Sequence, residues 1–164
     1  MLDTNEAAGT QSAPHVPAFD GDPILAMLTS MANFSGVELD ITLFVGGVVI
    51  SGVLIGGAEY MEAYARQFNA TLGDALSEED QRSTIEFAEG IARDVYAKDA
   101  TPEQKTQIRT SNKTMFIHLK DARFVTDGAG MIFLGEEGQG FWRGRLDKVD
   151  GFTLGALSAE QTDQ

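Results

Sequence analysis

The sequence predicts an α+β domain: a small, strongly bent antiparallel β-sheet or barrel of about five strands, with an N-terminal helix and a helical insertion. In residues 39–55, LDITLFVGGVVISGVLI, apolar residues alternate with a period of two on both sides of Gly46-Gly47, which is typical of a hairpin with a two-residue turn. Further strand-like segments lie between residues 114 and 157, and helical periodicity precedes and separates the two sets. Because a lone hairpin is only marginally stable in water, the later elements must cover it.

The bulk composition limits the class of function. The chain has 164 residues, a formal net charge of −13 and no cysteine. Disulfides, thiolate catalysis and Cys-based zinc sites are therefore excluded, and a cytoplasmic location is expected. The negative charge disfavours nucleic acid and anionic membrane surfaces as partners, because both repel an acidic protein. The longest apolar run, residues 41–55, is interrupted by glycine and is too short for a membrane helix.

The chain is expected to hold a single domain between two polar ends. Residues 1–21 are rich in Ala, Gly, Pro, Ser and Thr and show no periodicity, which predicts a disordered N-terminal arm. Residues 158–164 are expected to form a short polar tail. The domain then covers residues 22–157.

The first helix is predicted to begin at Asp22-Pro23 and to end at Gly36. Asp is a preferred N-cap, Pro is favoured at the first helical position, and Gly commonly follows the last turn. The apolar residues at helical spacing are Ile24, Leu25, Met27, Leu28 and Met31. We interpret their face as a lid on the sheet, because a small sheet needs a cover. An exposed docking face for a hydrophobic partner, centred on Met27 and Met31, is the alternative.

The hairpin has a predicted core side and a predicted solvent side. In its first strand Asp40 and Thr42 are expected to face solvent, with Phe44 as the apolar exception of the same parity. In its second strand Ser51-Gly52 predicts a bulge or a strong bend.

The helical insertion is expected over about residues 58–98. Its first helix runs from Ala58 to about Leu72, and its second begins after Ser77, a typical N-cap. Residues 74–99 hold eight acids and three bases, so their outer face is expected to be solvated, with a metal or a cationic partner as the alternative. The polar segment at 99–113 is compatible with a further turn of helix or with a loop.

Later strands are expected at residues 114–125, with a kink at Lys120-Asp121, and at 141–146. Between them a glycine-rich loop is expected to hold a short apolar strand or a plug at 131–134. Asp150-Gly151 is typical of a type I′ hairpin turn that leads into the last strand.

Catalytic patterns are weak in this sequence. His118 is the only histidine inside a predicted element, and a hydrolase reading would make it a general base oriented by Asp121 or Asp40. The sequence has no G-x-S-x-G motif that would supply a nucleophilic serine beside it. We therefore expect His118 to be a half-buried strand residue at a sheet edge. The glycine-rich segments do not have the spacing of a phosphate-binding loop. With two histidines and no cysteine, we expect neither a metal site nor a cofactor.

One segment combines an aromatic residue with two cations: Trp142, Arg143 and Arg145. Trp and Arg are enriched in the hot spots of protein interfaces. We therefore take these three residues as candidates for a protein contact. The alternative places Trp142 in the core of the sheet and leaves both arginines solvated or paired with local acids.

Three blocks resemble the gas vesicle accessory protein U family. They are LDITLFVGGVVISGVLIGGAEY at 39–60, MFIHLKDARFV at 115–125 and GFWRGRLDKVDGFTLGALS at 140–158. The resemblance implies an accessory role in the formation or the association state of gas vesicles in a prokaryotic cytoplasm, without enzymatic activity. It implies contacts with the vesicle shell protein, with other accessory proteins or with a second copy of the chain.

A weaker resemblance at the level of the fold is to Sm-like barrels. It rests on the order of a helix at 23–35, the bent hairpin at 45–55, the strand at 116–124 and the WRG segment at 142–144. The function it implies is a small-ligand or RNA-binding module unrelated to gas vesicles. Fold alone does not give function, and the acidic charge disfavours RNA.

Overall fold

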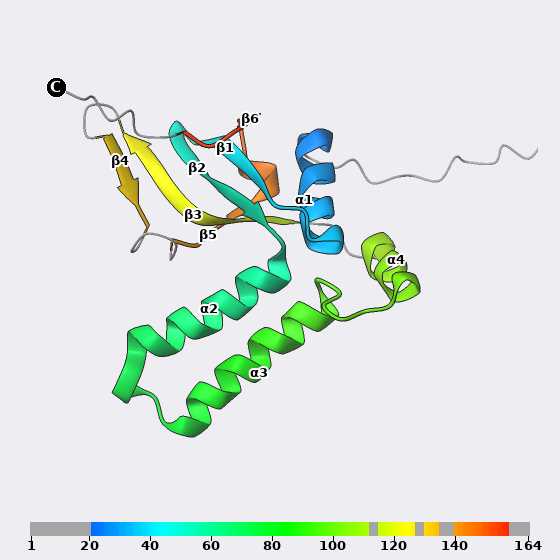
Figure 1. The fold of residues 1–164 in the computed structure, drawn as a ribbon, viewed down its shortest axis with the longest axis vertical. Coiled ribbons are helices and arrows are strands. Elements are labelled where there is room, and N and C mark those ends of the chain that lie inside the picture. The colour runs from blue at the N-terminus through cyan, green and yellow to red at the C-terminus, as the bar shows by residue number, and fades with distance from the viewer. Residues whose placement is uncertain (1–20, 112–114, 127–129, 135–139, 158–164) are drawn as a thin grey trace, which may run out of the picture.

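The computed structural model describes residues 21–111, 115–126, 130–134 and 140–157. The expected arm, except for Gly21, and the expected tail lie outside the described residues. A bent sheet forms one part of the molecule, α1 lies beside it, and a hairpin of two long helices extends away from it (Figure 1). The elements in chain order are α1 (Pro23–Ser35), β1 (Leu39–Val45), β2 (Val48–Ile55), α2 (Gly57–Leu72), η1 (Gly73–Ala75), α3 (Glu78–Asp94), α4 (Pro102–Ser111), β3 (Phe116–Thr126), β4 (Gly130–Phe133), β5 (Trp142–Arg145), η2 (Leu146–Lys148) and β6 (Gly151–Leu154).

The caps of α1 are those that the sequence predicts. The Asp22 side chain accepts hydrogen bonds from the backbone of Ile24 and Leu25, and Gly36 ends the helix in the left-handed conformation at φ 65°. The helix covers the sheet as predicted, and the side chains that it buries are Leu25, Thr29 and Ala32. A single covered face containing all five apolar residues is therefore wrong, because the buried face is rotated away from the methionines around the helix axis.

The hairpin has the predicted register. Val45 pairs with Val48, and Gly46 and Gly47 form the turn at φ 57° and 83°, values that side chains with a Cβ rarely adopt.

The predicted solvent position of Thr42 is wrong, since this side chain is buried. The segment after β6 crosses over it, and Thr42 Oγ1 donates to the Gly155 carbonyl at 2.9 Å. Ser51 Oγ lies 3.0 Å from Thr42 Oγ1 and accepts from the Leu157 backbone at 2.8 Å. These bonds satisfy both buried hydroxyls and hold residues 155–157 against the hairpin.

Six described strands occupy five positions in one antiparallel sheet. Their order is β4-β3-β2-β1-β6, and β5 continues along the edge of β3 that β4 also uses. Within the described part of the chain, no pairing joins β6 to β4 or β5, so the sheet is open and the barrel alternative is wrong.

Asp150-Gly151 does not form the predicted hairpin turn. β6 pairs with β1, whereas β5 pairs with β3, so the two consecutive strands are not neighbours. Asp150 instead accepts a hydrogen bond from Gly46 N through its carboxylate and donates its own N–H to the Phe44 carbonyl. It thereby supports the turn of the first hairpin.

The predicted bend at Ser51-Gly52 is present, but the extra residue belongs to β3. The register shifts between Ser51 and Val53, and Asp121 opposite has a positive φ of 51°. The strand continues through this bulge, where the sequence predicts a kink. A Cβ on Gly52 would lie 2.8 Å from the Lys120 carbonyl oxygen, so the bulge leaves no room for a side chain there.

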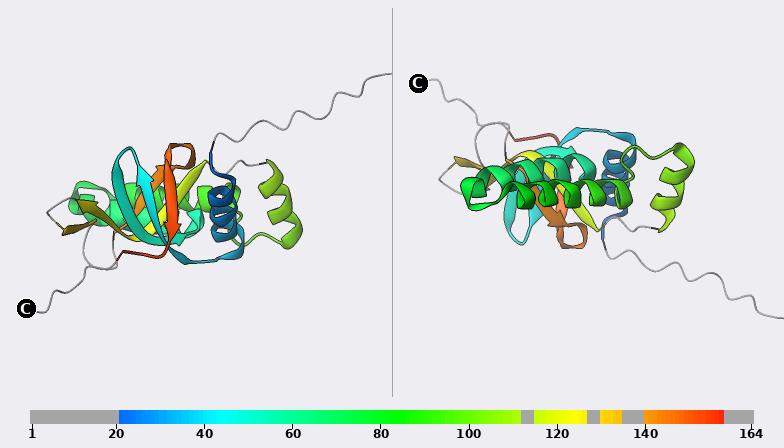
Figure 2. Two further views of the ribbon diagram at one scale, coloured as in Figure 1. Left: turned by 90° about the horizontal axis from the view of Figure 1, so that it is seen from above. Right: turned by 90° about the horizontal axis from the view of Figure 1, so that it is seen from below.

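The described residues form two separate hydrophobic clusters. The larger lies between the sheet and α1 and contains residues such as Leu25, Ile41, Leu54 and Leu119. The smaller lies inside the α2–α3 hairpin, where α3 begins with the predicted Ser77 cap as a full capping box with Asp80. Seen from below, α2 and α3 lie in front of the sheet, with α1 and α4 together at one end (Figure 2). α4 resolves the alternative left open at 99–113 in favour of a helix.

Candidate functional site

The three candidate residues of β5 divide between the two faces of the strand. Trp142 packs against the main core, and its ring covers Gly144, where an added Cβ would overlap the ring atoms. Arg143 and Arg145 are exposed and have the opposite parity. Trp142 thus adopts the core-anchor alternative, while the two arginines lie on the opposite face of the strand.

Arg143 lies among aromatic residues from β3, from α2 and from the turn after α3. Its guanidinium carbon lies 3.7 Å from the centre of the Phe116 ring, within cation–π distance. Burial raises the pKa of the Tyr60 and Tyr96 hydroxyls, and the positive charge of Arg143 acts against that increase. A cation held in this way is oriented by the protein, which favours a defined contact over a freely moving side chain.

His118 is completely buried beneath this cluster, so its predicted half-buried edge position is wrong. β3 has strands on both sides at this point, and α2 covers its outer face. The imidazole lies 4.7 Å from the Tyr60 ring and 5.5 Å from the Tyr96 ring, measured between centroids, and its Nε2 lies 3.4 Å from the Tyr96 hydroxyl. Nδ1 has no hydrogen-bond partner among the described residues.

This environment is unsuited to general base catalysis by His118. Burial first, and then the charge of Arg143, lower the pKa of His118 from 6.5 to about 3. A general base works best with a pKa near the operating pH and needs contact with the proton it removes. The described ring neighbours are tyrosines, so neither Asp121 nor Asp40 takes the orienting role of the hydrolase reading.

Arg145 is paired locally. Its guanidinium donates to both carboxylate oxygens of Asp147, with Nε at 2.9 Å from Oδ1. This bond raises the pKa of Arg145 and lowers that of Asp147. The pair is exposed, so it orients the guanidinium without contributing much to stability.

The other two candidates, Met27 and Met31, lie on the open side of α1. Together with Ile24 they form a stripe of large apolar side chains that are 56%, 53% and 40% exposed for Ile24, Met27 and Met31. Their spacing of three and four residues aligns them along one side of the helix. We call these three residues the α1 stripe.

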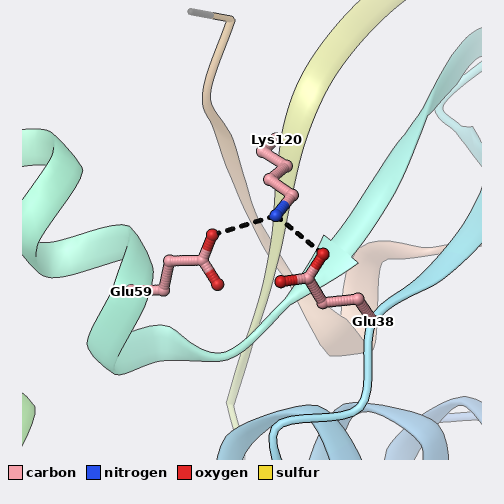
Figure 3. Close-up of polar contacts among 3 residues, drawn as sticks. All are labelled: Glu38, Glu59 and Lys120. Atoms are coloured by element: carbon pink, nitrogen blue, oxygen red, sulfur yellow. Dashed lines mark hydrogen bonds and ion pairs between the residues drawn. The ribbon is translucent and has the colours of Figure 1, made fainter. Parts of the chain in front are cut away.

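A partly exposed ion cluster links α2 to the sheet (Figure 3). Lys120 Nζ lies 2.7 Å from Glu38 Oε2 and 3.2 Å from Glu59 Oε1. Partial burial is the largest single influence and lowers the pKa of Lys120, but the bonds to the two carboxylates outweigh it and the pKa is raised. The cluster joins the segment before β1 to α2 and β3.

Sequence reasoning missed the residues that gather around Arg143. Tyr60 belongs to a visible helical stripe, and Phe116 and His118 share parity on β3, but nothing in the pattern places Tyr96 beside them. In the described ranges, no group of three or more His, Cys, Asp or Glu side chains is arranged to hold a metal ion. None of the described helices combines the length and the hydropathy needed to cross a lipid bilayer.

Comparison with known proteins identifies the family. No curated protein and no solved structure matches the chain. The small-ligand or RNA-binding function implied by the Sm-like resemblance therefore has no support. The sheet is open, so it does not form the barrel of that fold. The model of the family described as gas vesicle protein GvpU-like matches residues 22–157, which is most of the chain. The chain therefore belongs to the GvpU-like family of gas vesicle proteins.

Proposed function

We propose that this protein is a non-enzymatic gas vesicle accessory protein that acts through protein contacts in the assembly or clustering of vesicles. Its family supports the association with gas vesicles and hence a location in the cytoplasm. The α1 stripe carries the contact mechanism, because three large apolar side chains stand in water on a helix whose opposite side is already buried.

The α1 stripe is suited to a hydrophobic partner. Methionine side chains are flexible and polarisable and adapt to irregular apolar surfaces. An exposed stripe of this kind costs solubility unless a partner covers it. The vesicle shell protein is the first partner we propose, followed by another accessory protein and a second copy of this chain.

Arg143 and Arg145 form the second part of the proposed contact surface. Both are exposed, and both are held in place, Arg143 over Phe116 and Arg145 by Asp147. Trp142 supports them from the core side of β5. Because arginine is frequent at interface hot spots, we assign the orienting contacts to these two side chains.

A flotation assay with purified gas vesicles tests the α1 stripe. We compare wild type with a Met27→Gln, Met31→Gln double variant, which keeps helix propensity, and with Ile85→Gln as a control at a 43% exposed apolar position on α3. The double variant is expected to lose at least about tenfold in vesicle-bound protein, while the control retains binding. Equal flotation of all three proteins would overturn the assignment.

A second arm tests the arginines. An Arg143→Ala, Arg145→Ala double variant removes two exposed side chains and is expected to reduce both binding and vesicle clustering. Trp142→Ala is tested separately, with circular dichroism, because Trp142 packs against the core and its loss destabilises the fold. If wild type neither binds vesicles nor changes their clustering, the proposed function fails.

A further inference from the structure

The α2–α3 hairpin carries an apolar groove on one of its faces. Tyr64 and Phe68 of α2 line one side, and Phe87 of α3 lines the other. The remaining lining residues are Leu76, Asp80, Ser83 and Thr84. The groove has a volume of about 430 Å³. We call these seven residues the hairpin groove.

The aromatic side chains of the groove lie outside the core of the hairpin. The seam between the two helices includes the small residues Ala65, Ala88 and Ala92, which let the backbones approach closely at these points. Tyr64 and Phe87 are 41% and 63% exposed, and the Tyr64 and Phe68 rings stack at 5.9 Å between centroids. All seven lining residues belong to this hairpin, which extends away from the sheet (Figure 1).

The shape of the groove fits a helix. On α3 the lining positions Asp80, Ser83, Thr84 and Phe87 follow steps of three and four residues, so the groove runs along the helix axis for about 10 Å. Beyond Phe87 the next position on this side is Gly90, where an added Cβ would meet nothing within 4 Å. The groove therefore stays open toward the sheet, and a third helix can lie along both helices as in a helix-in-groove complex.

We propose that the hairpin groove binds an amphipathic helix of another protein, with an apolar face flanked by Lys and Arg. Charge decides the class of partner. α2 and α3 together hold eight carboxylates and three arginines, and Asp80 lies in the groove itself. A second copy would bring the same excess of negative charge to the interface and would be repelled. A basic helix gains from the aromatic contacts, from Asp80 and from the excess of negative charge on the two helices.

The groove is a different surface from the α1 stripe and the β5 arginines. Binding of a basic helix adds a partner class to the proposed function, but its test needs no vesicles. Failure of the flotation assay and failure of the peptide assay below are therefore distinguishable.

Fluorescence anisotropy with labelled synthetic peptides tests the inference on the full chain. The probe has about 18 residues, close to the length of α2 and α3, with Leu on one helical face and Lys on the other. A matched peptide carries Glu in place of Lys. Phe87→Ala removes the most exposed aromatic residue of the groove, and Ile85→Ala is the control on the same helix outside the groove. Ser83→Arg places a repelling charge in the groove at an exposed position.

The expected result is binding of the Lys peptide that weakens with salt, at least about tenfold loss with Phe87→Ala and with Ser83→Arg, and a change within about twofold for Ile85→Ala. Equal affinity for the Glu peptide would overturn the proposal, as would no binding of the Lys peptide or full binding by the Ser83→Arg variant. Analytical ultracentrifugation that shows a dimer dissociated by Phe87→Ala would assign the groove to a second copy instead.

Discussion

The buried histidine predicts how this protein loses stability in acid. In the folded state the pKa of His118 is about 3, because burial and then Arg143 disfavour its charged form, whereas the unfolded chain has the ordinary value of 6.5. Between these two values the unfolded state binds one more proton than the folded state. Stability therefore rises with pH in this window, and it is lost as the pH falls below 6.5.

The size of the loss follows from the two pKa values. Each pH unit inside the window changes the free energy of unfolding by about 1.4 kcal/mol for one proton. Between pH 7.5 and pH 5 the contribution of His118 is therefore about 2 kcal/mol, since only the range below 6.5 counts. That amount is a large fraction of the 5 to 15 kcal/mol, roughly, that holds a typical domain together.

Urea unfolding at pH 7.5, 6, 5.5 and 5, followed by circular dichroism, measures this loss for wild type and His118→Gln. The variant lacks the titrating group, so its stability is expected to fall by about 2 kcal/mol less than that of wild type over this range. Because both proteins contain the same carboxylates, the difference between their pH profiles isolates the contribution of His118. Arg143→Ala removes an exposed side chain and provides a second test. It is expected to raise the pKa of His118 toward 6.5, so this variant should lose less stability between pH 7.5 and pH 5 than wild type does. Parallel pH profiles for wild type and His118→Gln would refute the reasoning.

Four further substitutions test the packing, a helix cap and the ion cluster by thermal unfolding. Gly52→Ala forces a Cβ against the Lys120 carbonyl oxygen at 2.8 Å and is expected to destabilise the fold by about 1–3 kcal/mol. Gly90→Ala lies in open space within α3 and is expected to stabilise the fold by about 0.5–1 kcal/mol. Equal effects of the two substitutions would contradict the bulge geometry. Ser77→Ala removes half of the capping box of α3 and is expected to cost about 1 kcal/mol, with an unchanged melting temperature as the contrary result. Lys120→Met breaks both ion pairs of Figure 3 and is expected to cost about 0.5–1 kcal/mol at low salt, an effect that must shrink at high salt.

Local chemistry made several elements predictable. The Asp22-Pro23 start, the Gly46-Gly47 turn and the Ser77 cap depend on residues close in the chain, and the structure has all three. The Gly-Gly pair predicts its turn because few other residues adopt positive φ at two successive positions. For the same reason Gly36 marks the end of α1.

Predictions that depended on partners distant in the sequence were less successful. Thr42 has the parity of a solvent-facing residue, yet residues 155–157 cross over it and bury it. His118 lacks any local sign of burial, yet α2 and Tyr96 enclose it. Asp150-Gly151 has the composition of a hairpin turn, but β6 pairs with β1 and the turn is not formed.

For the candidate contact residues too, local sequence supplied the candidates and the tertiary structure decided their surroundings. The sequence singled out Arg143, Arg145, Met27 and Met31 as contact candidates from residue type and spacing alone, and their contact with a partner stays a prediction. Only the tertiary structure decided that Trp142 lies against the core, that Phe116 holds Arg143, and that the hairpin groove leaves Phe87 open. Composition, caps and strand periodicity are properties of neighbouring residues. Which face of an element is buried depends on segments tens of residues away, and that choice is made only when the chain packs.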